Sequence, residues 1–276
     1  MTAALAASSV QDTRRETARS AKIEIRDLSI DYMTNEGQSG HRALDRLTLD
    51  VFENEFLCVV GPSGCGKSTL IAAIAGFLRP RSGTLLLDGA TIRGPGADRG
   101  VVFQEYALLP WRTVLDNVTL GLRLRGVPRA ERNRVGARFL EMINLTDAAN
   151  KYPHQLSGGM KQRVAVARTL ANEPEVMLMD EPFAAVDAQS RMVLQEELVR
   201  IWLELRVTVL FVTHSVEEAV FLADRVAVLT PGPGQLKAIV DVDIPREQRN
   251  WAELGRNPRF AELREHVLHL VRGGQA

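Results

Sequence analysis

The chain has 276 residues, with 34 Lys and Arg against 34 Asp and Glu, so its formal net charge is zero. This balance argues against a generally basic nucleic-acid-binding protein, and we expect no nucleic-acid partner. Apolar residues make up 45% of the chain, enough for a substantial core, whereas two cysteines are too few for a disulfide scaffold. No apolar run approaches the roughly 20 residues that a membrane-spanning helix needs. Any membrane role is therefore expected to come through a partner.

Residues 1–21 are small, polar and charged without hydrophobic periodicity, so we predict a flexible N-terminal tail. The pair Arg14–Arg15 is followed by no apolar segment, which argues against an export signal. Alternating apolar residues at 23–32 and 47–51 predict two half-buried antiparallel strands, with a turn at 35–40 between them.

Further along, the continuous apolar run at 56–60 is typical of a strand covered on both faces. A helix to about Leu78 and a strand at 84–87 are expected next. The pattern then becomes helical from about 113 to 172, including a helix at 129–144.

Two buried-type strands, at 176–179 and 207–212, flank a long amphipathic helix, and a final short helix is expected around 260–270. Strands that alternate with helices predict an α/β fold with a largely parallel central sheet.

The segment GPSGCGKS at 61–68 matches G-x-x-x-x-G-K-[ST] between a predicted strand and a predicted helix. Its glycines let several backbone N–H groups point at an anion, and the helix N-terminus adds its dipole. Lys67 would supply charge to the β- and γ-phosphates, and Ser68 could offer its hydroxyl to Mg²⁺. A flexible glycine turn is the alternative, but the strand and helix around the segment favour phosphate binding.

Two carboxylates, Asp180 and Glu181, directly follow the apolar run at 176–179. Because buried unpaired charge is costly, a divalent cation held by Asp180 would relieve it. Glu181 could accept a proton from an attacking water, and Pro182 favours extended backbone at Glu181. A solvated acidic turn is the alternative.

The phosphate loop, the Asp180–Glu181 pair and Thr213–His214 each follow a short apolar strand. Because the carboxyl ends of parallel strands share one edge, these groups are expected to converge. His214 could then hydrogen-bond a γ-phosphate. The alternative is an ordinary loop histidine, which its place at this sheet edge disfavours.

A further motif, LSGGM at 156–160, places Ser157, Gly158 and Gly159 at the start of a helix. Such a start is a second anion-binding helix terminus, or else an ordinary N-cap. If it belongs to another copy of the chain, it can close over the γ-phosphate from the open side.

Together these motifs resemble the ATP-binding cassette (ABC) family over residues 22–246. The resemblance rests on their order: GPSGCGKST at 61–69, Gln104, LSGGMKQR at 156–163, VMLMDEP at 176–182 and His214. It implies a P-loop NTPase cassette with a parallel core sheet, an antiparallel β subdomain and a helical subdomain. The implied division is a cassette at 22–250 with its helical subdomain at about 105–172, and a helical extension at 251–276.

The resemblance also implies a head-to-tail homodimer that hydrolyses two ATP, each held between one copy's phosphate loop and the other's LSGGM. Glu181 would be the general base, His214 the switch histidine, Gln104 a Mg²⁺- and water-contacting residue, and Lys67 a further catalytic residue. The implied Mg²⁺ ligands are Ser68, Gln104 and Asp180. The implied ATP contacts are Tyr32, which stacks on adenine, and Gly61, Pro62, Ser63, Gly64, Cys65, Gly66, Lys67, Ser68, Thr69, Ser157, Gly158, Gly159 and Asp187.

One departure is the loop Ala184–Asp187, where relatives usually read Ser-Ala-Leu-Asp; Asp187 is kept and the serine hydroxyl is lost. Within the family, the segments 106–118 and 231–245 look like the nitrate, sulfonate and taurine importer group. That likeness implies a peripheral subunit on the cytoplasmic face of the membrane. Leu108, Leu109 and Trp111 would dock on a membrane permease, which in turn meets a solute-binding protein. The alternative is that some of these three side chains pack inside the helical subdomain.

Other functions fit less well. A soluble ABC ATPase of DNA repair or translation usually carries a long coiled-coil insertion or two cassettes. A nucleotide-gated scaffold would not need Glu181 and His214, and a P-loop kinase would not carry LSGGM. The sequence leaves the transported solute open.

Overall fold

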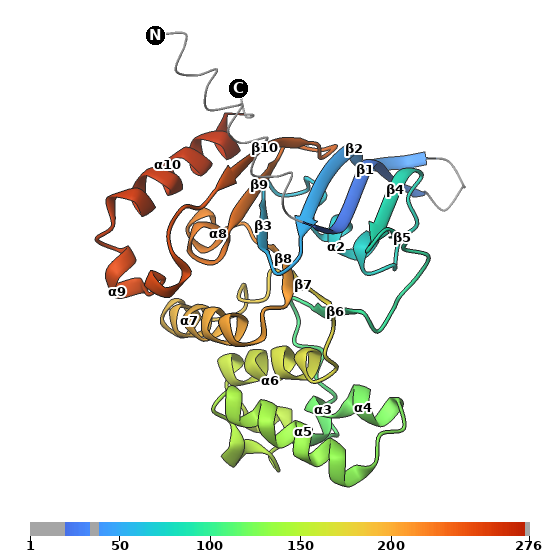
Figure 1. Ribbon diagram of the computed structural model, residues 1–276, viewed down its shortest axis with the longest axis vertical. Helices are drawn as coiled ribbons and strands as arrows, with labels where there is room; N and C mark the ends of the chain where they lie inside the picture. The colour runs from blue at the N-terminus through green and yellow to red at the C-terminus, as the bar shows by residue number, and fades with distance from the viewer. Residues whose placement is uncertain (1–19, 34–38, 274–276) are drawn as a thin grey trace.

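The computed structural model describes residues 20–33 and 39–273. The predicted tail therefore lies outside the described residues except at its last two positions, and so does most of the predicted turn at 35–40. Two sheets organise the chain (Figure 1): a four-stranded sheet in the order β2-β1-β4-β5, and a six-stranded sheet in the order β10-β9-β3-β8-β7-β6.

The four-stranded sheet is antiparallel, as the alternating pattern predicts. Ile23 and Ile25 of its first strand pair with Val51 and Leu49 of the second, and all four are buried. The strands are β1 Ala21–Met33, β2 Ser39–Phe52, β4 Ser82–Leu87 and β5 Ala90–Thr91.

The six-stranded sheet is parallel from β9 to β6, and only the edge strand β10 runs antiparallel. The prediction of a largely parallel central sheet is confirmed, although three of its strands, β6, β9 and β10, were not predicted. The strands are β3 Phe56–Val60, β6 Arg99–Val102, β7 Val176–Asp180, β8 Thr208–Val212, β9 Arg225–Leu229 and β10 Leu236–Asp241.

Alternate residues of β3 enter two different cores, which explains its continuous apolar run. Phe56 and Cys58 lie in the core that the sheet shares with most of the helices, while Leu57 and Val59 lie in the core that it shares with the antiparallel sheet and α2 (Lys67–Ile74). The helix α2 ends at Ile74, four residues before the predicted end at Leu78. Gly76 ends it with a φ of +83°, and a Cβ there would meet the Gly94 carbonyl at 2.2 Å.

The predicted helical stretch at 113–172 forms a layer below the central sheet in Figure 1, and α8, α9 and α10 lie beside the sheet, on the left of the view. The helices are α3 Val114–Val118, α4 Leu120–Leu124, α5 Arg129–Met142, α6 Gly158–Leu170, α7 Ala188–Leu205, α8 Val216–Leu222, α9 Trp251–Leu254 and α10 Pro258–Arg272. Short 3₁₀ turns cover Thr146–Ala148, Pro153–Gln155 and Arg246–Gln248.

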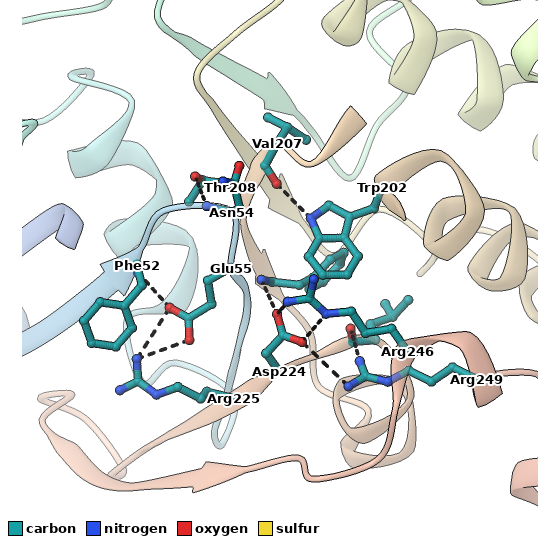
Figure 2. Close-up of polar contacts among 12 residues, drawn as sticks. Phe52, Asn54, Glu55, Trp202, Val207, Thr208, Asp224, Arg225, Arg246 and Arg249 are labelled. Atoms are coloured by element: carbon teal, nitrogen blue, oxygen red, sulfur yellow. Dashed lines mark hydrogen bonds and ion pairs between the residues drawn. The ribbon is translucent and has the colours of Figure 1, made fainter. Parts of the chain in front are cut away.

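Ion pairs hold the amino ends of the central strands (Figure 2). Arg225 donates to buried Glu55 at 3.2 Å, and burial raises the pKa of the Glu55 carboxyl. Asp224 accepts from the Phe56 N–H at 2.9 Å and from Arg246 Nε at 2.7 Å. This edge of the sheet is therefore closed by charge pairs that reach into the C-terminal segment.

Candidate active site

The opposite edge, at the carboxyl ends of the parallel strands, gathers the residues that the motifs single out. Val59 of β3 pairs with Val212 of β8, which pairs with Asp180 of β7. The phosphate loop, Glu181 and Thr213–His214 thus leave three neighbouring strands at one level. The predicted convergence of these groups is confirmed.

The phosphate loop curls around the ammonium group of Lys67. Lys67 Nζ donates to the carbonyl oxygens of Gly61 at 2.9 Å and Pro62 at 3.2 Å, and its side chain is buried. Gly66 precedes α2 with a φ of +94°, where a Cβ would lie 2.6 Å from the Ala43 carbonyl oxygen. Only glycine allows this close approach, which turns the first N–H groups of α2 towards the space inside the loop.

Two oxygen donors meet between the phosphate loop and β7. Ser68 Oγ donates to Asp180 Oδ1 at 2.9 Å. Burial is the main cause that raises the pKa of Asp180, and the neighbouring charge of Glu181 adds to it, against the bond from Ser68. A hydroxyl and a carboxylate at this distance, on a site that disfavours negative charge, fit a small divalent cation such as Mg²⁺.

Glu181 and His214 face each other across the site. His214 Nδ1 lies 3.0 Å from Glu181 Oε2, with Glu181 half-buried and His214 exposed. The backbone at Glu181 has a φ of +44°, so the expectation of extended backbone before Pro182 is wrong. The Glu181 N–H donates to the Val212 carbonyl at 3.0 Å, and this bond to the neighbouring strand holds the left-handed conformation, which non-glycine residues seldom adopt.

Three further predicted ATP contacts lie on three different segments of the chain. Tyr32 is 44% exposed, and its hydroxyl contacts Thr69 Oγ1 at 3.1 Å, so the ring stands beside the start of α2. Cys65 is fully buried, and burial raises the pKa of its thiol. Asp187 caps α7 by accepting from the Ser190 N–H at 3.0 Å, which lowers the pKa of the Asp187 carboxyl.

The LSGGM motif lies on a different helix from the phosphate loop. Ser157 is exposed and caps α6, where its Oγ accepts from the Met160 N–H at 3.3 Å. None of the hydrogen bonds found among residues 20–33 and 39–273 joins Ser157 to the phosphate loop. Within one chain, the N-terminus of α6 and that of α2 are therefore separate helix termini, with no hydrogen bond between Ser157 and the phosphate loop among the described residues.

Gln104 is exposed in the segment after β6, at the same sheet edge.

Two residues that were not predicted from the sequence, Arg168 and Asn117, hold this segment in place. Arg168 of α6 donates to the carbonyls of Ala107 at 2.6 Å and Tyr106 at 3.1 Å. Fully buried Asn117 accepts from the Leu109 N–H at 2.8 Å, and its side-chain NH₂ lies within 3.2 Å of three backbone carbonyl oxygens. The position of this asparagine between the buried Val114 and Val118 of α3 is the one signal that could have pointed to it.

The predicted docking residues differ in exposure. Trp111 is 69% exposed, whereas Leu108 and Leu109 are half-buried and Leu108 packs against the core. Of the three, only Trp111 offers most of its surface to a partner.

A phosphate loop between β3 and α2, faced by two carboxylates at the end of β7, defines a P-loop nucleotide-binding protein. A model of the ABC transporter family matches residues 44–184. With the relatives below, this match shows that the chain belongs to the ABC transporter family.

A taurine import ATP-binding protein of Rhizobium johnstonii is 46% identical over 252 residues, 90% of this chain and 96% of that protein. A nitrate import ATP-binding protein of Synechocystis is 43% identical over 255 residues, 91% and 95% of the two chains. A solved ATP-binding cassette in a dimeric post-hydrolysis state, bound to ADP and Pi, has a TM-score of 0.69 at 31% identity and covers 81% of this chain and 100% of that one.

These findings confirm the predicted family, the importer group that the chain resembles, the cassette fold and the assignment as an ATPase. Among the helices of the described residues, none has the length and apolar character needed to cross a membrane.

Proposed function

We propose that this chain is the ATP-hydrolysing subunit of an importer for a small anionic or zwitterionic solute of the nitrate, sulfonate or taurine type. Two copies bind two ATP with Mg²⁺ and drive a membrane permease from the cytoplasmic face, and the permease receives solute from a solute-binding protein. The observation that carries the proposal is the paired contact at one sheet edge, Ser68 with Asp180 and Glu181 with His214.

Each side chain has a definite task in this reaction. The loop N–H groups and Lys67 bind the β- and γ-phosphates and stabilise the charge that develops on the γ-phosphoryl oxygens. Glu181 accepts a proton from the water that attacks the γ-phosphorus in line, and His214 orients Glu181 and contacts the γ-phosphate. Ser68, Asp180 and Gln104 would hold Mg²⁺, which supplies positive charge to the phosphate oxygens.

The second copy completes the site. Ser157 caps α6, and the N–H groups of Gly158 and Gly159 belong to its first turn, so this helix N-terminus can take an anion from solvent. The dimeric cassette bound to ADP and Pi, at 31% identity, supports this assembly. Asp187 lies at the start of α7, where it can communicate between the two sites, and Tyr32 stacks on adenine.

We further propose a cassette unit at 22–250, with a helical subdomain at about 105–172 and a C-terminal extension at 251–276. The sheets and helices described above support this division. In this division, the predicted docking residues after Gln104 belong to the first part of the helical subdomain.

The proposal is tested by reconstituting the chain with its permease in proteoliposomes and measuring phosphate release and solute uptake. We expect ATP-dependent uptake of nitrate, taurine or another sulfonate, and loss of both activities in Lys67→Ala. Phosphate release with no uptake of any of these solutes would reject the solute class, and no release of phosphate would reject the enzymatic role.

Docking is tested by Trp111→Glu. Because this exposed indole would meet an apolar surface of the permease, we expect co-purification with the permease to fall at least about tenfold, while ATP binding by the chain alone is unchanged. The control is Met192→Glu, an equally drastic change at an exposed apolar side chain of α7. Unchanged co-purification of Trp111→Glu would count against docking through this residue.

A further inference from the structure

Glu218 is a buried carboxylate that the proposed reaction does not use. It lies on α8, the helix that begins two residues after His214, and only 6% of its surface is exposed. Its Oε2 accepts a hydrogen bond from the Thr213 hydroxyl, and its Oε1 accepts from Gln195 Nε2 at 2.7 Å. Burial is the largest influence on its pKa and raises it, while both hydrogen bonds favour the carboxylate.

The bond to Thr213 fixes the backbone on both sides of His214. While its hydroxyl donates to Glu218, Thr213 Oγ1 accepts from the Ser215 N–H at 3.0 Å. Ser215 Oγ in turn accepts from the Glu218 N–H at 3.2 Å. His214 is therefore an exposed residue between two hydrogen-bonded neighbours, Thr213 and Ser215. Its imidazole contacts Glu181.

The same line of hydrogen bonds continues away from the site into the C-terminal segment. Trp251 Nε1 donates to Gln195 Oε1 at 3.1 Å. Because an indole N–H can only donate, it fixes the orientation of the Gln195 amide, whose NH₂ group must then face Glu218. Trp251 is held by ring stacking on Phe221 of α8, with centroids 4.2 Å apart and planes 10° from parallel.

We propose that Glu218 is a positioning residue for His214, and that the C-terminal segment takes part in this through the line Trp251–Gln195–Glu218–Thr213. The inference rests on the proposed role of His214 in ATP hydrolysis. In this line each hydrogen bond has a fixed donor and a fixed acceptor, so a shift of α9 changes the position of each following side chain. The last of them is Thr213, which sets the backbone next to His214.

The kinetic test compares Glu218→Ala, Thr213→Val and Glu218→Gln in the chain assembled with its permease. We expect the first two to lower the kcat of ATP hydrolysis about tenfold or more, with KM for ATP changed less than about twofold, because misplacing a catalytic side chain affects the transition state more than binding. Glu218→Gln should stay within about threefold of wild type, since its amide can accept from Gln195 and donate to Thr213.

A second readout does not depend on hydrolysis. The His214 ring signals in the NMR spectrum of the full chain are identified by their loss in His214→Gln. We expect them to shift in Glu218→Ala and Thr213→Val and to stay close to wild type in Glu218→Gln. The control Val267→Ala opens a fully buried site in α10, and it should lower thermal stability without moving these signals or kcat.

Wild-type His214 signals and wild-type kcat in both Glu218→Ala and Thr213→Val would overturn the inference. If the wild-type assembly fails to hydrolyse ATP, the proposed function fails, while the NMR comparison still decides whether Glu218 positions His214. Trp251→Phe keeps the stacked ring but loses the N–H that orients Gln195, so it should lower kcat in the wild-type background and have no further effect in Glu218→Ala.

If the effects of Trp251→Phe and Glu218→Ala on kcat simply add, the C-terminal segment does not act through Glu218.

Discussion

Glu181→Gln is expected to slow ATP hydrolysis by about 10²–10⁴-fold, the range that a positioned general base contributes. The amide cannot accept the proton of the attacking water, but it can still hydrogen-bond His214, as the carboxylate does at 3.0 Å. ATP affinity should therefore be kept. Because the nucleotide is not consumed, the variant should also accumulate as an ATP-bound dimer, which gel filtration with Mg·ATP would detect.

The matched control for this variant is Glu173→Gln, the same chemical change at an exposed glutamate after α6. It should leave both turnover and assembly unaltered. Wild-type turnover in Glu181→Gln would show that Glu181 is not the general base. A Glu181→Gln variant that stays strictly monomeric at saturating Mg·ATP would contradict the proposal that two copies share each ATP site.

Arg225→Met is expected to lower the free energy of unfolding by about 3–5 kcal/mol, because it leaves the buried carboxylate of Glu55 without its cationic partner. The Arg225 guanidinium also lies 4.8 Å above the Phe52 ring, so packing is lost as well. Urea denaturation at pH 7 measures the loss. The double variant Glu55→Gln/Arg225→Met should recover a large part of it, since position 55 then no longer holds an unpaired buried carboxylate.

The pH dependence of the Arg225→Met deficit has a definite sign. Burial already raises the pKa of Glu55, and removing Arg225 raises it further. A raised folded-state pKa favours folding below the unfolded value of about 4.3, and that benefit is lost as the pH rises through the folded pKa. The deficit should therefore be smallest near pH 4 and grow towards neutrality. A deficit that does not depend on pH would assign the loss to packing alone.

Much of the active edge can be predicted from sequence because its parts are local. Each motif directly follows an apolar strand, and a parallel sheet brings strand ends together without further assumptions. The left-handed backbone of Glu181 could not be predicted, because a hydrogen bond to Val212, 31 positions further along the chain, holds it.

Long-range partners also explain why Glu218 escaped notice. Gln195 and Trp251 lie 23 and 33 residues away in sequence, and only packing of α7, α8 and α9 brings them to its carboxylate. The edge strand β10 was missed for a related reason: the exposed Lys237 and the half-buried Ala238 weaken its apolar pattern, and pairing with β9 determines the strand.

The charge pairs at the amino ends of β3 and β9 predict which mutant alleles lower the amount of this subunit in the cell. They anchor the sheet on the side away from the phosphate loop, so amino-acid changes on the two sides should produce different defects. Alleles altered near Asp224 would yield scarce subunit in the cell, whereas alleles altered at Lys67 would yield abundant but inert subunit. Immunoblots of transport-deficient strains would sort the two kinds without any enzyme assay.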